Sequence, residues 1–301
     1  MVDTLKMFKE INKLIDNHLI DSSLDNFSVI IGSNPSKGAR SPILWNKVYK
    51  EEKKNVAMLP LDVNSDGLLE LILLLQEHRN CLGGAIAVPH KEAMFKILQD
   101  ECAPEIKEIG AINCFFRNTK TSLKHFSGTN TDGEASLDPI QKLINEENKF
   151  NIALIGFGGT GKAIAAFLIK HLKRSHDLKI FNRTKIKQPK TKFNVSFLDL
   201  KVIRNYIDSF DLIINATTLG TKYSPTESPI PPGLFGKIKK DAIIYDINYD
   251  PPKTKFIKLA EEKNLRAING LRMNLIQAVL AYRYTNETSL TQNKIYEIMN
   301  S

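Results

Sequence analysis

Residues 156–162 read Gly-Phe-Gly-Gly-Thr-Gly-Lys, directly after the apolar run Ile152–Ile155 and directly before the helical pattern Ala163–Ile169. The stretch fits G-x-G-x-x-G between a strand and a helix. In that pattern the first glycine makes the turn, the second lets a pyrophosphate approach the backbone, and the third packs helix on strand. The helix N-terminus would face the phosphates. The stretch therefore predicts a dinucleotide-binding turn formed by Gly156, Gly158, Gly159 and Gly161.

The same residues also fit the phosphate-loop pattern G-x-x-x-x-G-K as far as Lys162. A nucleotide triphosphatase needs a Ser or Thr hydroxyl at the next position, where it contacts magnesium. Ala163 stands there. A dinucleotide is therefore favoured over a nucleoside triphosphate.

The end of the next strand indicates which dinucleotide is bound. NAD enzymes carry an acid there for the ribose hydroxyl, whereas this chain reads Phe181-Asn182-Arg183-Thr184, without a carboxylate. Arg183 can pair with a 2′-phosphate. Asn182, Arg183 and Thr184 are thus predicted cofactor contacts, and NADP is favoured over NAD. The alternative is that Arg183 only caps a loop.

Strands and helices alternate on both sides of this turn. Apolar runs and helical patterns succeed one another from Phe27 to Leu98, and the runs at 112–116 and 123–126 predict two closing, antiparallel strands. A second alternating series starts at Asn151. This alternation predicts an α/β protein with two domains, the first mainly parallel and covered by helices on both faces, the second a Rossmann fold. The sequence turns polar between them, near 137–147.

The expected ranges are 1–135 for the first domain, 136–270 for the Rossmann domain and 271–301 for helices that return to the first domain. Apolar residues at three- and four-residue steps add an N-terminal amphipathic helix over 4–19.

Composition excludes several classes of protein. The 301 residues are 42% hydrophobic and 25% charged, which is ordinary globular usage. The longest apolar run, Leu68–Leu75, contains Glu70 and is far shorter than the roughly 18 residues of a membrane span. Charges are spread through the N-terminal region, unlike a signal peptide. We therefore expect a cytoplasmic protein with no membrane partner.

Charge and cysteine content point to neither metal nor nucleic acid. Three cysteines are spaced too widely for a CxxC pair, so no disulfide framework or metal site is indicated. The net charge of +9 is compatible with nucleic acid or small anionic ligands. Lys and Arg are scattered, however, with only short clusters such as Lys185–Lys192, and no basic and aromatic residues interleave. A solvated Lys-rich surface is favoured, with no nucleic-acid partner.

Several motifs together resemble the shikimate dehydrogenase family in order and spacing, from about Phe27 to Tyr284. They are P-H-K-E at 89–92, A-I-N-C at 111–114, G-T-N-T-D-G at 128–133, the glycine turn, F-N-R-T at 181–184, I-N-A-T-T-L-G at 214–220, Y-D-P-P-K-T at 249–254 and M-N-L-I-Q-A at 273–278.

The resemblance implies an NADP-dependent oxidoreductase that interconverts 3-dehydroshikimate and shikimate, an anionic cyclic hydroxy acid, in a cleft between the domains. It implies that Lys91 and Asp132 are the catalytic pair and that the protein is a monomer or homodimer. It further implies substrate contacts at Ser41, Asn113, Tyr249 and Gln277, and cofactor contacts at Thr217 and Gly270.

The chemistry of ketone reduction supports the role of Lys91. Hydride addition leaves an alkoxide that must be protonated, so a donor within hydrogen-bond reach is required. Lys91 follows a strand and stands just inside a helix start after Pro89, where ligands gather in α/β sheets. Asp132, taken locally, stands in a polar loop that could equally be a turn with an Asx hydrogen bond.

The recognition residues depart from the family pattern. The family motif Ser-x-Ser-Pro is Ala39-Arg40-Ser41-Pro42 here, the histidine before the following asparagine is Trp45, and N-V-T-V-P is Ala85-Ile86-Ala87-Val88-Pro89. Each lost hydrogen bond is worth about 0.5–3 kcal/mol. Arg40 could clasp a carboxylate instead. A paralogue acting on quinate or an aminated analogue therefore remains an alternative, as does a non-catalytic NADP-binding protein.

Overall fold

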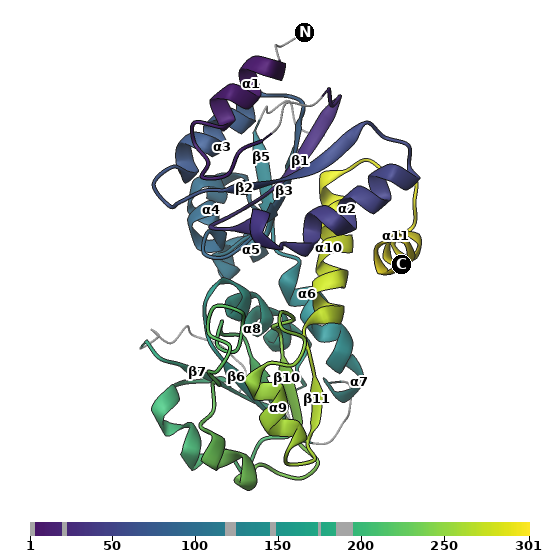
Figure 1. The fold of residues 1–301 in the computed structure, drawn as a ribbon. Helices are drawn as coiled ribbons and strands as arrows, with labels where there is room; N and C mark the ends of the chain where they lie inside the picture. The colour runs from purple at the N-terminus through teal and green to yellow at the C-terminus, as the bar shows by residue number, and fades with distance from the viewer. Residues whose placement is uncertain (1–3, 20–22, 118–124, 145–148, 174–175, 185–194) are drawn as a thin grey trace. The chain divides into compact units, whose positions relative to one another are not determined.

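The computed structural model describes residues 4–19, 23–117, 125–144, 149–173, 176–184 and 195–301 (Figure 1). The chain forms two compact units. The first consists of Met1–Thr131 together with Leu275–Ser301, and the second of Asp132–Asn274. Asp132 therefore belongs with the second unit, although the sequence analysis put it in the first range.

The first unit contains a five-stranded sheet in the order β2-β1-β3-β4-β5. β1 pairs in parallel with β2 and β3, whereas β4 pairs antiparallel with β3 and β5. Nearly every residue of β1 is buried, as a strand covered on both faces requires. The strands are β1 (Asn26–Gly32), β2 (Val56–Asp62), β3 (Cys81–Ile86), β4 (Cys114–Arg117) and β5 (Phe126–Thr129).

This arrangement confirms the expected mainly parallel sheet with two closing antiparallel strands. The second closing strand begins at Phe126, where the expected one ended, and positions 123 and 124 lie outside the described residues. Helices cover both faces of the sheet (Figure 1). They are α1 (Thr4–Ile11), α2 (Arg40–Glu51), α3 (Leu68–Glu77), α4 (Lys91–Leu98), α5 (Pro104–Ile109), the part of α10 (Leu271–Thr285) from Leu275 onward, and α11 (Gln292–Asn300).

The N-terminal helix is shorter than expected, because it ends at Ile11 rather than continuing to residue 19. The side chain of Asn17 donates to the Pro60 carbonyl at 2.9 Å and accepts from the Asp62 N–H at 2.7 Å. These bonds hold the chain along β2, which a continuing helix would not allow. The apolar spacing correctly indicated burial, since Ile15 and Leu19 are buried, but it wrongly indicated helix.

An aromatic cluster joins the C-terminal helices to α2. Trp45, Tyr49 and Tyr282 are almost fully buried, with ring centroids 5.3–6.5 Å apart. Their rings pack in one hydrophobic core with residues of β1, β2, β3, α10 and α11. The C-terminal helices from Leu275 onward therefore pack on the first unit.

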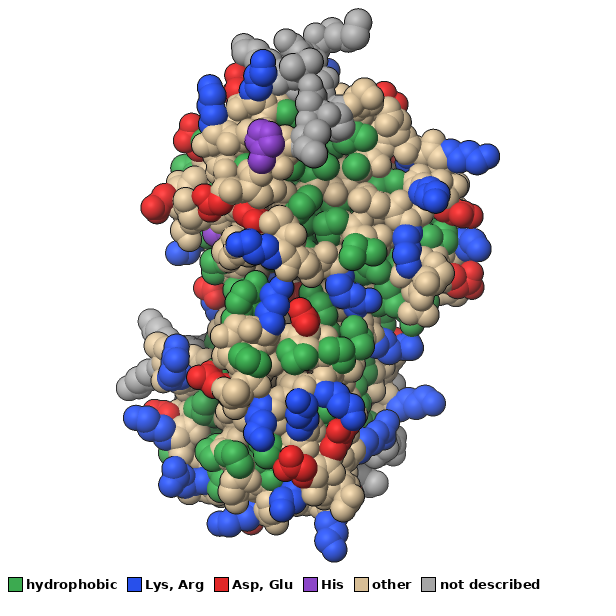
Figure 2. Space-filling model, viewed as in Figure 1, with side chains coloured by type: hydrophobic (Ala, Val, Ile, Leu, Met, Phe, Trp, Pro, Cys, Tyr) green, Lys and Arg blue, Asp and Glu red, His purple; other side chains and the backbone are tan. Residues whose placement is uncertain are grey.

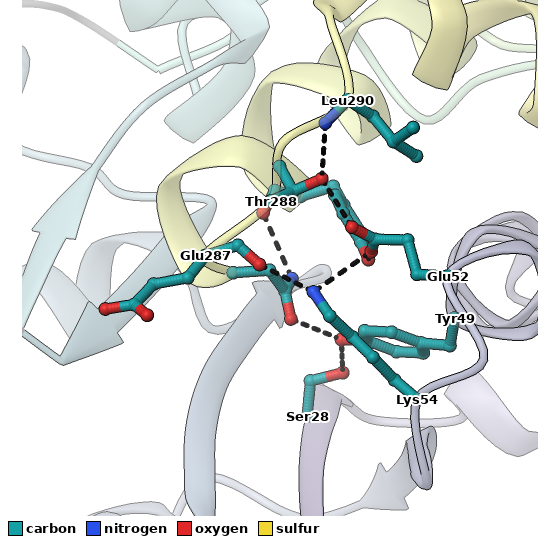
Figure 3. A network of polar contacts seen from close by, with 9 residues as sticks. Ser28, Tyr49, Glu52, Lys54, Glu287, Thr288 and Leu290 are labelled. Atoms are coloured by element: carbon teal, nitrogen blue, oxygen red, sulfur yellow. Dashed lines mark hydrogen bonds and ion pairs between the residues drawn. The ribbon is translucent and has the colours of Figure 1, made fainter.

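A polar network reinforces the same contact (Figure 3). The carboxylate of Glu52, at the end of α2, accepts hydrogen bonds from the hydroxyls of Tyr282 and of Thr288, the latter at 2.6 Å. Lys54 Nζ lies 3.1 Å from the same carboxylate. Burial alone would raise the pKa of Glu52, but these hydrogen bonds and Lys54 outweigh it and hold the pKa below its ordinary value.

The second unit contains a six-stranded sheet in the order β11-β10-β9-β6-β7-β8, and all its pairs are parallel. This is the strand order of a Rossmann fold, as expected from the sequence. The strands are β6 (Asn151–Ile155), β7 (Asp177–Asn182), β8 (Val195–Asp199), β9 (Leu212–Asn215), β10 (Ile243–Asp246) and β11 (Arg266–Ile268).

One face of this sheet packs on a large apolar core. That core combines alternate residues of β6, β9 and β10 with side chains of α9 and of two 3-10 helices. α6 and α8 contact each other closely elsewhere in the unit. The helical segments are α6 (Asp132–Leu137), α7 (Gln141–Ile144), α8 (Gly159–His171) and α9 (Lys255–Glu261), with 3-10 helices at Asp138–Ile140, Leu200–Asn205 and Pro232–Lys237.

The surface carries Lys and Arg side chains interspersed with Asp and Glu on the face drawn in Figure 2. The cluster Lys185–Lys192 lies outside the described residues.

The three cysteines are buried free thiols, and burial raises the pKa of each: Cys81, Cys102 and Cys114. Within the described ranges, no helix is long and apolar enough to cross a membrane, and no group of His, Cys, Asp and Glu could hold a metal ion.

Candidate active site

The glycine turn has the geometry that its sequence predicts. Gly156 has φ +99°, and a Cβ added there would lie 2.8 Å from Thr217 Cγ2. A Cβ on Gly161 would lie 2.3 Å from the carbonyl oxygen of Gly156. A Cβ on Gly158, by contrast, would meet no atom within 4 Å. The protein's own packing thus requires two of the glycines, while Gly158 borders open space that a pyrophosphate could occupy.

The helix that follows is suited to bind phosphate. α8 runs for 13 residues from Gly159, so its first N–H groups have no partner within the helix. It carries no acidic residue in its first turn, which would repel an anion. Ala163 is fully buried and provides no hydroxyl for a magnesium ion. These features fit a dinucleotide phosphate better than a nucleoside triphosphate.

The end of β7 is tied to the glycine turn through Asn182. Asn182 Oδ1 accepts a hydrogen bond from the Phe157 N–H at 3.1 Å, and Asn182 Nδ2 donates to the Thr184 carbonyl at 2.9 Å. Arg183 is exposed beside them. This segment therefore offers a cation where an adenosine 2′-phosphate would be bound, and no carboxylate at 182–184 would oppose it.

Thr217 and Gly270 lie just beyond the carboxyl ends of β9 and β11, the two strands that flank β10 in the sheet. Asn248 Nδ2 donates to the Thr217 carbonyl at 3.0 Å, and the Gly270 N–H donates to the Asn248 carbonyl at 3.0 Å. A Cβ on Gly270 would lie 1.8 Å from the Ile247 carbonyl oxygen, so only glycine fits there. Tyr249 follows Asn248 and is half-buried. Ligands of α/β sheets bind at this edge.

A buried carboxyl group lies behind these loops. Asp246, at the end of β10, accepts hydrogen bonds from Asn215 Nδ2 at 3.0 Å and from Thr254 Oγ1 at 2.6 Å. Burial raises the pKa of Asp246 to about 6, although these hydrogen bonds oppose the rise. No sequence motif marks it as part of the site. It holds the loops after β9 and β10 together from within.

Two predicted substrate residues of the first unit lie together. Asn113 Nδ2 donates to Thr131 Oγ1 at 2.9 Å and lies 3.3 Å from Gln277 Oε1. The Thr131 N–H donates to Asn113 Oδ1 at 2.8 Å. Thr131 was missed in the sequence analysis, although it directly precedes Asp132 in the N-T-D-G motif. The three side chains form a polar cluster, which we call the Asn113 cluster.

Lys91 lies beside the Asn113 cluster. It is the first residue of α4, and its carbonyl accepts the Ile112 N–H at 3.0 Å, one residue before Asn113. Its side chain is half-buried. The neighbouring His90 is buried, with Nε2 2.8 Å from the Val63 carbonyl oxygen. The imidazole is therefore engaged by the main chain, whereas Lys91 stands at the helix start.

Ser41 and the residues that depart from the family pattern lie on or near the aromatic core. Ser41 is buried in the first turn of α2. Trp45 is fully buried, and its Nε1 donates to the Ala278 carbonyl at 3.2 Å. Ala39 and Ala87 are partly buried and pack against the core that contains Trp45. The two positions that lack hydroxyls, Ala39 and Ala87, thus adjoin the apolar core around Trp45, and we call this surface the apolar wall.

Asp132 does not lie in a loop, contrary to the local sequence interpretation. It is the first residue of α6 and is almost fully buried. Its Oδ2 accepts a hydrogen bond from Thr160 Oγ1 at 3.0 Å. Thr160 belongs to the glycine turn, and its contact with Asp132 could not be anticipated from the sequence. Lys91, Asn113 and Gln277 belong to the first unit, whereas Asp132 and Tyr249 belong to the second.

Known proteins resemble the chain over most of its length. A family model of the shikimate dehydrogenase substrate binding domain matches residues 30–115. The shikimate dehydrogenase (NADP(+)) of Methanococcus aeolicus is 31% identical over 277 residues, which cover 88% of this chain and 95% of that protein.

Solved structures agree. A shikimate dehydrogenase from Aquifex aeolicus superposes with a TM-score of 0.76 at 26% identity, covering 94% of this chain and 100% of that one. A shikimate dehydrogenase in complex with NADP+ gives a TM-score of 0.76 at 25% identity, covering 94% and 96%. With the glycine turn, the Lys91 environment and the N-T-D-G segment in place, the chain belongs to the shikimate dehydrogenase family.

Proposed function

We propose that this protein is an NADP-dependent oxidoreductase that interconverts 3-dehydroshikimate and shikimate. The observation that carries the proposal is the position of Lys91 beside the Asn113 cluster, at the carboxyl end of the first sheet. The relationship to shikimate dehydrogenases over 88% of the chain supports it. The first unit would bind the substrate and the second NADP.

The residues that would hold NADP fit that group. The open space at Gly158 would admit the pyrophosphate, the N-terminus of α8 would face it, and Arg183 would pair with the 2′-phosphate. NADP, when bound, supplies or accepts the hydride. Four further residues would shape the loops around the cofactor. Hydrogen bonds already tie each of them to those loops: Asn182, Thr184, Thr217 and Gly270.

The proton is handled by the protein. In the reducing direction the carbonyl oxygen gains negative charge, and the Lys91 ammonium gives it a proton to form the alcohol. In the oxidising direction the neutral amine takes that proton back. Asp132 would hold the ammonium of Lys91 in place as a partner carboxylate. Ser41, Asn113, Tyr249 and Gln277 would bind the substrate's oxygen atoms and fix its orientation.

The residues that depart from the family pattern leave one alternative substrate class open. Ala39 and Ala87 supply no hydroxyl and adjoin the core that contains Trp45. If the missing hydroxyls weaken the binding of shikimate, a related cyclic hydroxy acid, such as quinate or an aminated analogue, is the alternative substrate. The proposed setting is the cytoplasm, with the protein acting as a monomer or homodimer and without nucleic acid or membrane partners.

The test is the initial rate of NADP+ reduction, followed by absorbance, with shikimate, quinate and aminated analogues as substrates. We expect reduction with shikimate or one of these relatives, and loss of the rate in Lys91→Ala. A protein that binds NADP+ but oxidises none of them would be a non-catalytic relative. Preferential turnover of quinate would establish the alternative.

A further inference from the structure

Thr160 occupies an unusual position for a residue of the glycine turn. It is the second residue of α8, at the end of the helix that would face the cofactor phosphates. Its hydroxyl nevertheless donates to Asp132 Oδ2 at 3.0 Å. The contact lies within the second unit and joins the cofactor helix to the carboxylate that would handle the proton together with Lys91.

The packing of α6 on α8 explains how this contact arises. A Cβ on Gly133 would lie 2.7 Å from the Ala163 carbonyl oxygen and 2.2 Å from the ring of Phe167. Gly133 therefore allows the backbones of the two helices to approach closely. Thr160, Ala163 and Phe167 stand three and four residues apart and so share one face of α8. That face receives the first turn of α6, where Asp132 stands.

The hydrogen bond from Thr160 limits the orientations that the Asp132 carboxylate can adopt. An aspartate side chain can rotate, and proton transfer requires a defined direction of its oxygen atoms. A hydroxyl that donates to one oxygen limits that rotation. Thr is β-branched and has few χ1 rotamers available within a helix, so its hydroxyl is itself well placed. Asp132 is almost fully buried, which strengthens the hydrogen bond relative to one in water.

We propose that Thr160 is a positioning residue that orients the Asp132 carboxylate from the cofactor-binding helix. The inference rests on the proposed function, because it needs Asp132 to take part in the reaction. It adds a role for Thr160 distinct from phosphate binding: the hydroxyl serves the carboxylate, while the backbone N–H groups of the same turn serve the cofactor. Thr160 acts through Asp132 and is not itself a catalytic residue.

The first test compares Thr160→Val with Thr160→Ser. Valine keeps the shape of threonine without the hydroxyl, and serine keeps the hydroxyl without the methyl group. We expect Thr160→Val to lower kcat about tenfold or more, because misplacing a catalytic group is costly. The NADP+ dissociation constant, measured by calorimetry, should stay within about twofold, since the backbone contacts to phosphate remain. Thr160→Ser should keep most of the wild-type kcat.

A merely structural role would give a different pattern. In that case Thr160→Val would lower Tm while kcat stayed within about twofold of the wild-type value, and the inference would be overturned. A large loss of NADP+ affinity with unchanged kcat would overturn it as well. Thr160→Ala provides a second variant without the hydroxyl should valine impair folding, and circular dichroism at the assay temperature checks that each variant is folded.

Asp132→Asn separates this inference from the proposed function. If the wild-type protein turns over substrate and Asp132→Asn is severely impaired, the function stands and only the Thr160 variants decide the inference. If Asp132→Asn keeps full activity, the assignment of Asp132 fails first. In the Asp132→Asn background, Thr160→Val should lower kcat by no more than about twofold, because the two residues would act as one unit.

Discussion

Asn182 at the end of β7 accepts, through Oδ1, a hydrogen bond from the Phe157 N–H in the glycine turn at 3.1 Å. The contact fixes the start of the loop that presents Arg183. An acid in this loop would favour the ribose hydroxyl of NAD. The amide and the cation found here favour the 2′-phosphate of NADP instead.

The first prediction follows from that loop. Arg183→Ala should raise the dissociation constant of NADP+ about tenfold to a hundredfold, as expected for a lost charge-assisted hydrogen bond of about 1.5–3 kcal/mol. The affinity for NAD+ should change little. Calorimetric titration measures both. Arg204→Ala removes another exposed arginine of the same unit and serves as the control. Equal affinity of the wild-type protein for the two dinucleotides would contradict the prediction.

The fold could be predicted wherever strands are buried. Covered parallel strands such as β1 and β6 appear as continuous apolar runs, and these were assigned correctly. β8 and β11 were missed because both are sheet-edge strands with few buried residues, so they leave little apolar signal. The end of α1 was missed because it depends on the hydrogen bonds of Asn17 with distant residues of β2.

The second prediction concerns Lys91 and Asp132. Lys91→Ala and Asp132→Asn should each lower kcat by about a hundredfold or more, the usual contribution of acid–base catalysis. Because the two residues would handle one proton, kcat of the double variant should be only slightly lower than kcat of the less active single variant. Lys96→Ala, at an exposed position of the same helix, is the control.

Steady-state kinetics of the four proteins gives the coupling directly. Losses that multiply in the double variant would show that Lys91 and Asp132 act independently. Full activity of Lys91→Ala would return that lysine to the ordinary surface charges. Either result would count against the proposed pair without affecting the family assignment.

The third prediction concerns the apolar wall. Ala39→Ser combined with Ala87→Thr should raise kcat/KM for shikimate at least about tenfold, or roughly 1.4 kcal/mol of recovered binding. Ala39 is also the N-cap of α2 and makes no side-chain cap, so a serine hydroxyl at this position should add about 1 kcal/mol of stability. Ala39→Ser alone separates that capping gain, seen as Tm, from the gain in kcat/KM.

Ala85→Ser is the control, because Ala85 is buried in the same core and the added hydroxyl would find apolar neighbours. It should lower stability without improving shikimate use. If Arg40 already binds the carboxylate, the gain from the two substitutions would be smaller, and Arg40→Ala would be damaging. A wild-type KM in the micromolar range with fast turnover would refute the view that these positions impair shikimate use.

The candidate site was predictable to the extent that short motifs carry its chemistry. Lys91, Asn113 and Gln277 could be named from the sequence, and the structure brings them near one another. The contacts of Thr131 and Thr160 could not be named, because each arises from tertiary packing of segments far apart in the chain. Trp45 likewise read as a lost polar residue, whereas it is part of the core.

The fourth prediction compares two glycines of the second unit. Gly133→Ala places a methyl group against the Ala163 carbonyl and Phe167, so it should lower the free energy of unfolding by about 1–3 kcal/mol. Gly158→Ala meets no protein atom and has φ −80°, so stability should change little. Its methyl group would enter the space proposed for the pyrophosphate, and NADP+ affinity should fall. Urea unfolding and calorimetry measure the two effects, and the reverse pattern would contradict the assignment.

The fifth prediction is a pH dependence of stability caused by Asp246. Burial raises its pKa to about 6 in the folded protein, against about 3.9 in an unfolded chain. Between these values the folded state binds more protons than the unfolded state, so the free energy of unfolding should fall as pH rises from about 4 to 6. The full difference corresponds to about 2–3 kcal/mol.

The variant that tests this prediction is Asp246→Asn, because its side chain cannot titrate and retains an oxygen for the hydrogen bond from Asn215. Urea unfolding at pH 4, 5, 6 and 7 should therefore show a smaller decline for the variant, and parallel curves for the two proteins would show that Asp246 does not titrate in this window.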